Sequence, residues 1–242
     1  TGLRYIEQYE RAAKHGRVHP NLSVTETGRI CTSDPNVQST PKSVRSILVA
    51  DPRYTFVKAD WRAMHLRLLA NLSLDSELIK LFADGSDPFV ALASMLYSHD
   101  VSEITNAERS TTKAVTYALL YGGYCASLAR RHHLAVEAVQ EYRDACLRRF
   151  RGVKRWVRRV IEEARKNGSV FTINNRRLSP IGDSASSIGK GRVINRILQG
   201  SEADLLAEAI VKMDSAFNDS GNIISFPIHD EILTQSRAGW LE

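Results

Sequence analysis

The sequence predicts an α+β fold, in which a small antiparallel sheet with flanking helices carries a mostly helical lobe. Three observations support this. Residues 54–59 (YTFVKA) are aromatic, β-branched and bounded by turn residues, as is typical of a strand. Residues 75–167 show helical periodicity with few interruptions. A long helical stretch and two short apolar runs then end the chain. A strand, a helical insertion, a helix and a hairpin in this order fit an α+β domain.

Composition sets the outer limits. The 242 residues are 43% hydrophobic, enough for one large domain or two interlocked lobes, and 25% charged, which excludes a disordered chain. The net charge of +6 is compatible with a phosphate-backbone partner, although many basic proteins bind no nucleic acid. No apolar run is long enough to span a membrane. The widely spaced Cys31, Cys125 and Cys146 indicate neither a disulfide framework nor a zinc site, and fit reduced thiols in an intracellular protein.

The first elements follow from local patterns. Residues 3–14 are expected to be the end of a helix, and residues 15–53 to be rich in loops because glycine and proline punctuate them. After the strand, a helix is expected at about Arg62 to Leu72, and Asp75 is a plausible N-cap for the next one. Further helices are predicted at roughly 75–83, 88–97, 106–121, 135–149 and 152–167.

The C-terminal part mixes strands with one long helix. Ser169–Ile173 favours a strand, and residues 182–191 favour a flexible loop. A helix is predicted from about Arg192 to Phe217. Ile223–Phe226 and Glu231–Gln235 then favour two strands of a hairpin, with residues 228–230 at or near the connection.

Acidic residues occur where two of these strands end. Asp60 ends the first strand, and Asp230 and Glu231 lie in or beside the hairpin, all among apolar neighbours. An ionised carboxylate in such surroundings needs a cation or a hydrogen-bond network. Two carboxylates from separate strands can hold two Mg²⁺ ions. Ordinary solvated turn residues are the alternative.

A second pattern lies on one helix. Arg109, Lys113, Tyr117 and Tyr121 recur every four residues and form one slowly drifting stripe. Two like charges at this spacing favour an anionic partner, such as a triphosphate, with an aromatic ring stacked on a base or sugar. A solvated basic face with the aromatic residues packed inward is the alternative.

Polar side chains elsewhere can read acceptors in the DNA minor groove without strong sequence preference. An irregular segment, Thr27–Pro41, offers long hydrogen-bonding side chains, and Asn195 and Gln199 share one helix face. Ordinary surface positions explain each of these residues equally well when taken alone. The candidates are Arg29, Asn36, Gln38, Arg176, Asn195 and Gln199.

Taken together and in order, these segments resemble DNA polymerase family A, the DNA polymerase I-like enzymes. DWRAMHLRLLANLS at Asp60–Ser73 is similar to the first palm motif, D-Y-S-Q-x-E-L-R-x-x-A-H-L-S, and RSTTKAVTYALLYG at Arg109–Gly122 to the fingers helix, R-x-x-x-K-x-x-x-F/Y-G-x-x-Y-G. His229–Glu231 is similar to the last palm motif, H-D-E. Between them lie look-alikes of the minor-groove loop (Thr27–Pro41), of the N-x-x-x-Q-G-x-x-A-D helix (Asn195–Asp204) and of the G-R-R hairpin (residues 175–177).

The resemblance implies a palm at residues 1–74 and 181–242 and fingers at 75–180, as a fragment of a longer polymerase. It implies that Asp60, Asp230 and the backbone carbonyl of Trp61 meet two Mg²⁺ ions, and that Glu231 is an auxiliary acid near the primer end. The remaining implied roles are contacts with the nucleotide and contacts with DNA. The incoming nucleotide or its template is expected to meet Arg109, Lys113, Tyr117, Tyr121 and His65, and Lys113 is also expected to assist the departure of pyrophosphate. The primer–template is expected to lie along Arg29, Asn36, Gln38, Arg176, Asn195, Gln199 and His229.

Several positions depart from the family pattern. His65 stands where the family has the glutamate that excludes the ribose 2′-hydroxyl, so discrimination against ribonucleotides is open. Arg62-Ala63 replaces Ser-Gln, Ala118 replaces a glycine, and Phe89 replaces a histidine that meets the triphosphate, as also occurs in the theta-like and nu-like branch. Tyr117 resembles members that accept dideoxynucleotides readily, and we expect the same here.

The resemblance therefore implies a DNA-dependent DNA polymerase that acts in replication or repair, with primer–template DNA and dNTPs as partners and no membrane. The alternatives are a catalytically inactive DNA-binding paralogue, a theta-like repair or lesion-bypass polymerase with relaxed sugar selectivity, and a single-subunit RNA polymerase. An intracellular location at DNA is expected. Bacterial cytoplasm, a phage-infected cell, nucleus and mitochondrion stay open, as do accessory proteins and a proofreading domain.

Overall fold

The computed structural model describes the chain except for residues 1, 42, 84, 179–188, 218–219 and 238–242. It divides into two compact units. The sheet unit contains Thr1–Arg62 and Gln199–Glu242, and the helical unit contains Ala63–Leu198. The palm and fingers boundaries at residues 74 and 180 stay a prediction. The expected flexible loop at 182–191 lies almost wholly outside the described residues.

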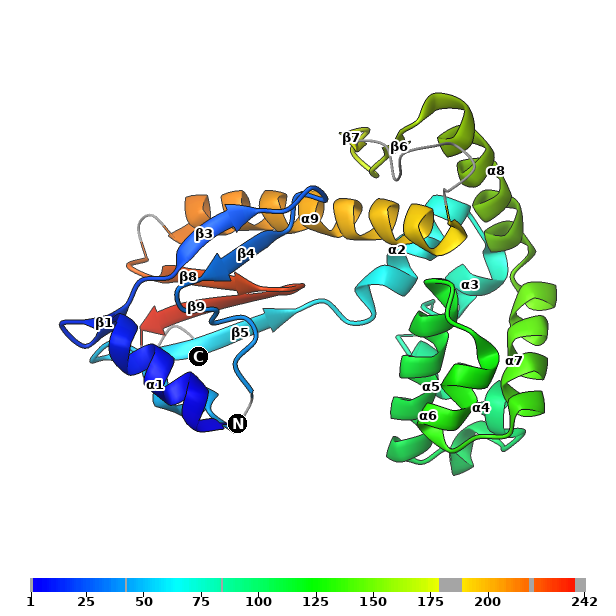
Figure 1. Cartoon of the computed structure of the whole chain (residues 1–242), viewed down its shortest axis with the longest axis horizontal. Coiled ribbons are helices and arrows are strands. Elements are labelled where there is room, and N and C mark those ends of the chain that lie inside the picture. The colour runs from blue at the N-terminus through cyan, green and yellow to red at the C-terminus, as the bar shows by residue number, and fades with distance from the viewer. Residues whose placement is uncertain (1, 42, 84, 179–188, 218–219, 238–242) are drawn as a thin grey trace. The chain divides into compact units, whose positions relative to one another are not determined.

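A three-stranded antiparallel sheet organises the sheet unit (Figure 1). Its strands are β5 (Tyr54–Asp60), β8 (Ile223–Ile228) and β9 (Glu231–Arg237), and β9 lies in the centre. The register pairs Tyr54 with Arg237 and Asp60 with Glu231, so β5 and β9 are matched over their full length. Both strands of the predicted hairpin are confirmed, and β8 extends two residues beyond the expected end.

Two small hairpins lie where the end of a helix (residues 3–14) and a loop-rich segment (residues 15–53) were predicted, which is a correction. β1 (Ala13–Lys14) pairs with β2 (Arg17–Val18), and β3 (Asn21–Val24) pairs with β4 (Ile30–Ser33). The side chains of β3 are all exposed. Its four residues do alternate polar and apolar side chains, so this strand was detectable in the sequence, although Leu22 and Val24 stay exposed.

Helices complete the sheet unit. They are α1 (Gly2–Ala12), the short 3-10 helix η1 (Arg45–Ile47) and the part of α9 (Lys190–Phe217) that begins at Gln199. Tyr9 is buried on α1 and its hydroxyl lies 2.5 Å from the hydroxyl of Thr40. Ile228 and Ile232 contribute to the buried core from the two strands of the hairpin.

The helical unit is built almost wholly of helices, as predicted. The helices of this unit are α2 (Met64–Ser73), α3 (Ser76–Lys80), α4 (Pro88–Tyr97), the 3-10 helix η2 (Val101–Glu103), α5 (Asn106–Leu120), α6 (Cys125–His132), α7 (Val136–Arg149), α8 (Arg151–Asn167) and the start of α9. Of these, α6 was not predicted. A two-stranded sheet of β6 (Val170–Phe171) and β7 (Arg177–Leu178) follows α8.

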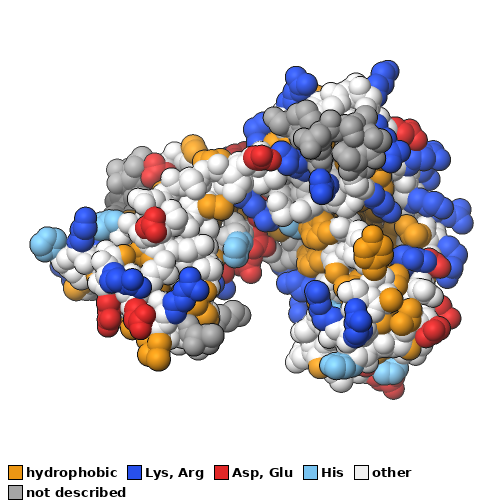
Figure 2. Space-filling model, viewed as in Figure 1, with side chains coloured by type: hydrophobic (Ala, Val, Ile, Leu, Met, Phe, Trp, Pro, Cys, Tyr) orange, Lys and Arg blue, Asp and Glu red, His pale blue; other side chains and the backbone are white. Residues whose placement is uncertain are grey.

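The core of the helical unit lies between α4, α5 and α7, since α4 packs against both of the others. Phe89, Val115 and Tyr142 come from these three helices and are at most 1% exposed. α8 packs against α2 through an apolar face that includes Trp156 and Val160. Figure 2 shows Lys and Arg side chains gathered over α8, on its solvent side.

One buried carboxylate joins two of these helices. Asp75 is the predicted N-cap of α3, and its Oδ1 accepts a hydrogen bond from the backbone N–H of Leu78 at 2.9 Å. Its Oδ2 accepts from the backbone N–H groups of Gly152 at 2.5 Å and Val153 at 3.2 Å. α8 has no side-chain cap of its own at Phe150, so Asp75 caps both helices.

Among the described residues, no helix combines the length and the apolar character needed to cross a membrane.

We predict that Asp75→Ala lowers the free energy of unfolding by about 1–3 kcal/mol, because two buried N–H groups and one part-buried N–H group lose their acceptor. Asp100→Ala is the matched control, since Asp100 caps only the exposed η2. Urea unfolding followed by circular dichroism measures both. Equal losses in the two variants would contradict the double capping role.

Candidate active site

The sheet unit carries a cluster of three carboxylates, Asp60, Asp230 and Glu231, which we call the carboxylate cluster. Asp60 ends β5 and is paired in register with Glu231, the first residue of β9. Asp230 precedes Glu231 in the two-residue turn that joins β8 to β9. Paired Cα atoms of antiparallel strands lie roughly 4.5–5.5 Å apart. The register therefore brings the three residues together at one end of the β5–β9 pair.

Two of these carboxylates form no hydrogen bond or ion pair with any described part of the chain. Asp60 is exposed and Asp230 is half-buried. Neither side chain makes a hydrogen bond or an ion pair with any residue that the structure describes. Of the three acids only Glu231 is buried, because Asp60 stands at a strand end and Asp230 in a turn.

Glu231 is buried and neutralised. Its Oε2 lies 2.8 Å from Nζ of Lys58, and its Oε1 lies 4.0 Å from Nη1 of Arg45. The hydrogen bond to Glu231, together with the charge of that carboxylate, raises the pKa of Lys58. Sequence analysis missed Lys58 and Arg45. Lys58 was detectable, since residues two apart on a strand share a face and place it beside Asp60.

The carboxylate cluster is suited to Mg²⁺ that takes some of its ligands from the protein and the rest from the substrate. Mg²⁺ favours one or two carboxylates together with substrate phosphates and water over a cage made wholly of protein. Within the described part of the chain, no group of three or more His, Cys, Asp and Glu side chains is arranged to hold a metal alone. The two solvent-facing carboxylates, Asp60 and Asp230, suit the first arrangement. Trp61 follows Asp60 directly, and the role of its carbonyl stays a prediction.

The helical unit carries the stripe predicted on α5, which we call the basic-aromatic face: Arg109, Lys113, Tyr117 and Tyr121. A capping box starts the helix, since Thr105 Oγ1 accepts from the N–H of Glu108 and the Glu108 carboxylate accepts from the N–H of Thr105. The helix runs to Leu120, with Tyr121 as its C-cap. The predicted helical spacing of the four residues is therefore confirmed.

Arg109 already has an anionic partner. Its Nε and one Nη lie 2.6 Å and 2.5 Å from Oδ2 of Asp87. The other oxygen of Asp87 accepts from the N–H of Phe89 and caps α4. Sequence analysis took the charges of α5 to favour an outside anion, and it missed this pair, although Asp87-Pro88 is a recognisable helix start.

Aromatic rings surround these cations. The Phe89 ring is 1% exposed, with the guanidinium carbon of Arg109 and the Lys113 ammonium nitrogen 6.0 Å and 5.8 Å from its centroid. At these distances both cations interact with its face. The ring of Tyr117 lies edge-on to Phe89 at 5.5 Å and nearly parallel to that of Tyr121 at 6.4 Å.

His65 joins this aromatic group from α2. Its Nδ1 is hydrogen-bonded to the Tyr121 hydroxyl, and its ring lies edge-on to Tyr117 with centroids 6.1 Å apart. Thus the residue at the position of the family's sugar-excluding glutamate contacts both tyrosines of the stripe. Only the spacing along α5 was visible in the sequence; the link to α2 was not.

The expected minor-groove residues in the sheet unit are partly engaged with the chain. The amide nitrogen of Gln38, which is buried, donates to the carbonyls of Ile30 at 2.9 Å and Pro227 at 3.0 Å. Arg29 pairs with the buried Glu202. Exposed Asn36 accepts from the N–H of Ser39, which closes a local turn. Gln38 therefore ties β4 to β8, and DNA contacts by these three residues stay a prediction.

The other expected DNA contacts lie at helix and turn positions. Asn195 and Gln199 are one helical turn apart on α9, and Oδ1 of Asn195 is buried without a hydrogen-bond partner among the described residues. His229 is exposed, with a left-handed backbone (φ 58°) in the β8–β9 turn. Arg176 lies in the turn between β6 and β7. Their contacts with DNA also stay a prediction.

Comparison with known proteins gives one consistent result. The family model described as DNA polymerase family A matches residues 3–241. The chain is 30% identical to a DNA polymerase I of Mycobacterium bovis over 95% of its own length. It is also 30% identical to the thermostable DNA polymerase I of Thermus thermophilus over 91% of its length. The chain spans 27% and 28% of these two relatives.

A solved structure matches the fold over 98% of the chain, with a TM-score of 0.86 and 29% identity. It is the POL domain of Pol1 from M. smegmatis in complex with DNA primer-template and dNTP, and the match covers 45% of that chain. The predicted α+β class and the predicted family are both confirmed.

We predict that Lys58→Gln lowers the free energy of unfolding near pH 8 by less than about 1 kcal/mol, since the ammonium group is half exposed. A raised lysine pKa contributes stability that is complete below the ordinary value of about 10.4 and is lost as the pH rises through the raised value. The difference between wild type and variant should therefore shrink toward about pH 12.

Denaturant unfolding at both pH values measures this difference. Lys14→Gln is the control, because the exposed Lys14 forms no ion pair with a described residue and should change stability at neither pH. A difference for Lys58→Gln that does not change with pH would show that the Lys58–Glu231 pair does not carry the effect.

Proposed function

The chain belongs to DNA polymerase family A, and on this premise we propose that it forms the nucleotidyl-transfer core of a DNA-dependent DNA polymerase. The substrates are primer–template DNA and deoxynucleoside triphosphates. The enzyme acts on intracellular DNA, in replication or repair. The observation that carries the proposal is the pairing of Asp60 with Glu231 in the register of β5 and β9, which brings Asp60 near the turn that holds Asp230.

Asp60 and Asp230 would hold two Mg²⁺ ions, with the carbonyl of Trp61 as a further oxygen ligand. Ions held there would supply positive charge for the oxygens that gain negative charge during nucleotidyl transfer. Lys58 and Arg45 pair with the buried Glu231 and hold it in place, as an auxiliary acid near the primer end. Because Glu231 is already neutralised, the two aspartates are the carboxylates available to metal.

The basic-aromatic face binds the incoming nucleotide. Asp87 occupies one edge of the Arg109 guanidinium, which leaves its remaining N–H groups for a phosphate oxygen. Lys113 offers a second cation one turn further on and assists the departing pyrophosphate. Tyr117 stacks on the base or sugar, and Tyr121 lies by the template.

His65 takes part in sugar selection. Its ring is held by the Tyr121 hydroxyl against the edge of Tyr117, so an imidazole fills the space that meets the nucleotide sugar. An imidazole is bulky and cannot carry a negative charge, so His65 would oppose a 2′-hydroxyl by its size.

The primer–template lies along the residues with long polar side chains. We assign residues 1–74 and 181–242 to the palm and 75–180 to the fingers. Similarity to a polymerase domain solved with DNA primer-template and dNTP supports these partners. The residues assigned to the DNA are Arg29, Asn36, Gln38, Arg176, Asn195, Gln199 and His229.

We predict that Asp230→Asn lowers primer extension with dNTPs and Mg²⁺ by at least about 10²–10³-fold, since the amide cannot supply an anionic metal ligand. Extension of a labelled primer measures it, in the natural protein that contains this chain. Asp100→Asn is the control, because this exposed acid lies outside the carboxylate cluster. Extension that survives in Asp230→Asn would reject the assignment of Asp230.

We further predict that Asp87→Asn raises KM for dNTPs several-fold with a smaller change in kcat, because Arg109 loses the anion that orients it. Asparagine keeps the N-cap of α4, so the melting temperature should stay nearly unchanged. Steady-state kinetics and thermal unfolding together separate the two roles. A lower KM would mean that Asp87 competes with the triphosphate instead of orienting its partner.

A further inference from the structure

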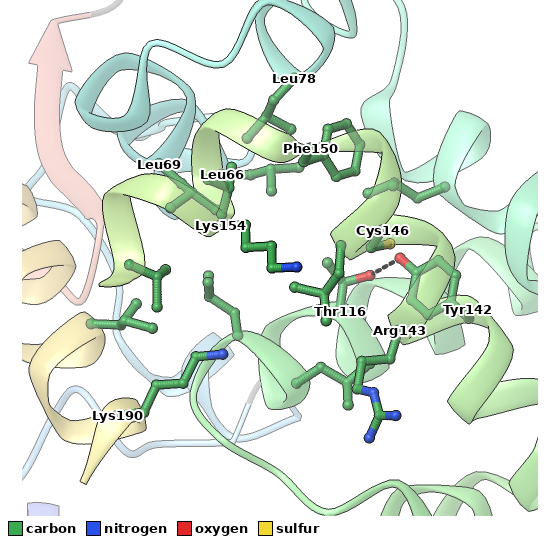
Figure 3. Close-up of a pocket in the computed structure, with 17 residues that line it drawn as sticks. Leu66, Leu69, Leu78, Thr116, Tyr142, Arg143, Cys146, Phe150, Lys154 and Lys190 are labelled. Atoms are coloured by element: carbon green, nitrogen blue, oxygen red, sulfur yellow. Dashed lines mark hydrogen bonds between the residues drawn. The ribbon is translucent and has the colours of Figure 1, made fainter. Parts of the chain in front are cut away.

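The helical unit contains a cavity of about 180 Å³, and none of the residues proposed to bind the nucleotide is among those that line it (Figure 3). Its wall is mostly apolar and comes from α2, α3, α4, α5, α7, α8 and the start of α9. Leu66 and Leu69 come from α2, Leu119 from α5, and Phe150 and Val157 from the C-cap of α7 and from α8. An apolar cavity of about 150 Å³ in an engineered protein stays dry and binds benzene. This cavity is therefore large enough for an aromatic ring system.

The charged groups along the cavity have one sign. Lys154 and Lys190 point their ammonium groups toward it, and Arg143 lies at its edge (Figure 3). Neither lysine side chain makes a hydrogen bond or ion pair with a described residue, and no Asp or Glu is among the residues that line the cavity. Lys154 also belongs to a run of cations on α8, together with Arg155 and Arg158, and their combined field attracts anions.

The other polar groups of the cavity wall either form hydrogen bonds with each other or carry no charge. The hydroxyls of Thr116 and Tyr142 are hydrogen-bonded to each other at 2.6 Å. Burial raises the pKa of the Cys146 thiol to about 11, so this group is uncharged at neutral pH. A ligand therefore meets an uncharged interior and two ammonium groups at the mouth.

We propose that this cavity is a binding site for a small aromatic anion, a carboxylate or sulfonate whose ring fills the apolar interior while its charge meets Lys154 and Lys190. Thr116 and Leu120 line the cavity from α5, and each precedes a tyrosine of the basic-aromatic face. A ligand bound here contacts the same helix as the proposed nucleotide site, from a neighbouring face about 100° away.

Calorimetric titration of the chain with naphthalene-2-sulfonate tests the proposal, with the neutral naphthalen-2-ylmethanol as the matched ligand. We expect saturable binding of one sulfonate, about five- to tenfold tighter than the alcohol, because a charge-assisted contact adds to the same ring burial. Lys154→Gln should remove most of this preference. Arg158→Gln should keep it, since it removes an equal charge from α8 at a residue that does not line the cavity.

Leu147→Trp tests the location. Leu147 lines the cavity but is 36% exposed, so a larger side chain can enter the mouth without disrupting the core. We expect this variant to weaken sulfonate binding more than about tenfold while the melting temperature holds. No saturable binding, equal affinity for the two ligands, or unchanged binding in Leu147→Trp would each overturn the proposal. Binding is measured directly, so none of these outcomes depends on polymerase activity.

Discussion

The register of β5 against β9 is the constraint on which the candidate chemistry depends. By pairing Asp60 with Glu231, it gathers three carboxylates at one end of the strands. Two like charges about 4 Å apart repel by about 1 kcal/mol in water and about 4 kcal/mol near a protein surface. Among the described residues, the chain offsets this repulsion at Glu231, through Lys58 and Arg45. Asp60 and Asp230 stay open to solvent, which is where an outside cation can complete the balance.

In the helical unit, α5 brings together like charges of the opposite sign. There the like charges are cations, and Asp87 neutralises Arg109 while the Phe89 ring lies beside both Arg109 and Lys113. Each cluster thus keeps one member tied to the protein and another available to a ligand. Fixing the tied member costs entropy during folding and not during binding, which favours preorganised contacts with a charged substrate.

Local patterns in the sequence predicted the helices other than α6, the strands β5, β8 and β9, and the stripe on α5, because hydrophobic period, caps and turn residues act over a few positions. The β3 strand was missed although its four residues alternate polar and apolar, because so short a run in a loop-rich segment is easily overlooked. Contacts between distant residues were invisible. Arg109 meets Asp87 across 22 positions, and Gln38 meets Pro227 across 189. Motif order identified the family, but it could not assign Gln38 to a tie between two strands.

The carboxylate cluster depends on one register between β5 and β9. A slip of one residue between β5 and β9 would send Lys58 and Asp60 to the opposite face of the sheet, away from Glu231. Burial opposes that slip, since Ile232 is 1% exposed and is paired with Ala59 on one side and Pro227 on the other. The irregularity in β8 lies between Ile224 and Phe226, before the paired stretch that ends at the turn. An apolar residue in the central strand therefore fixes the position of the acids on both sides of it.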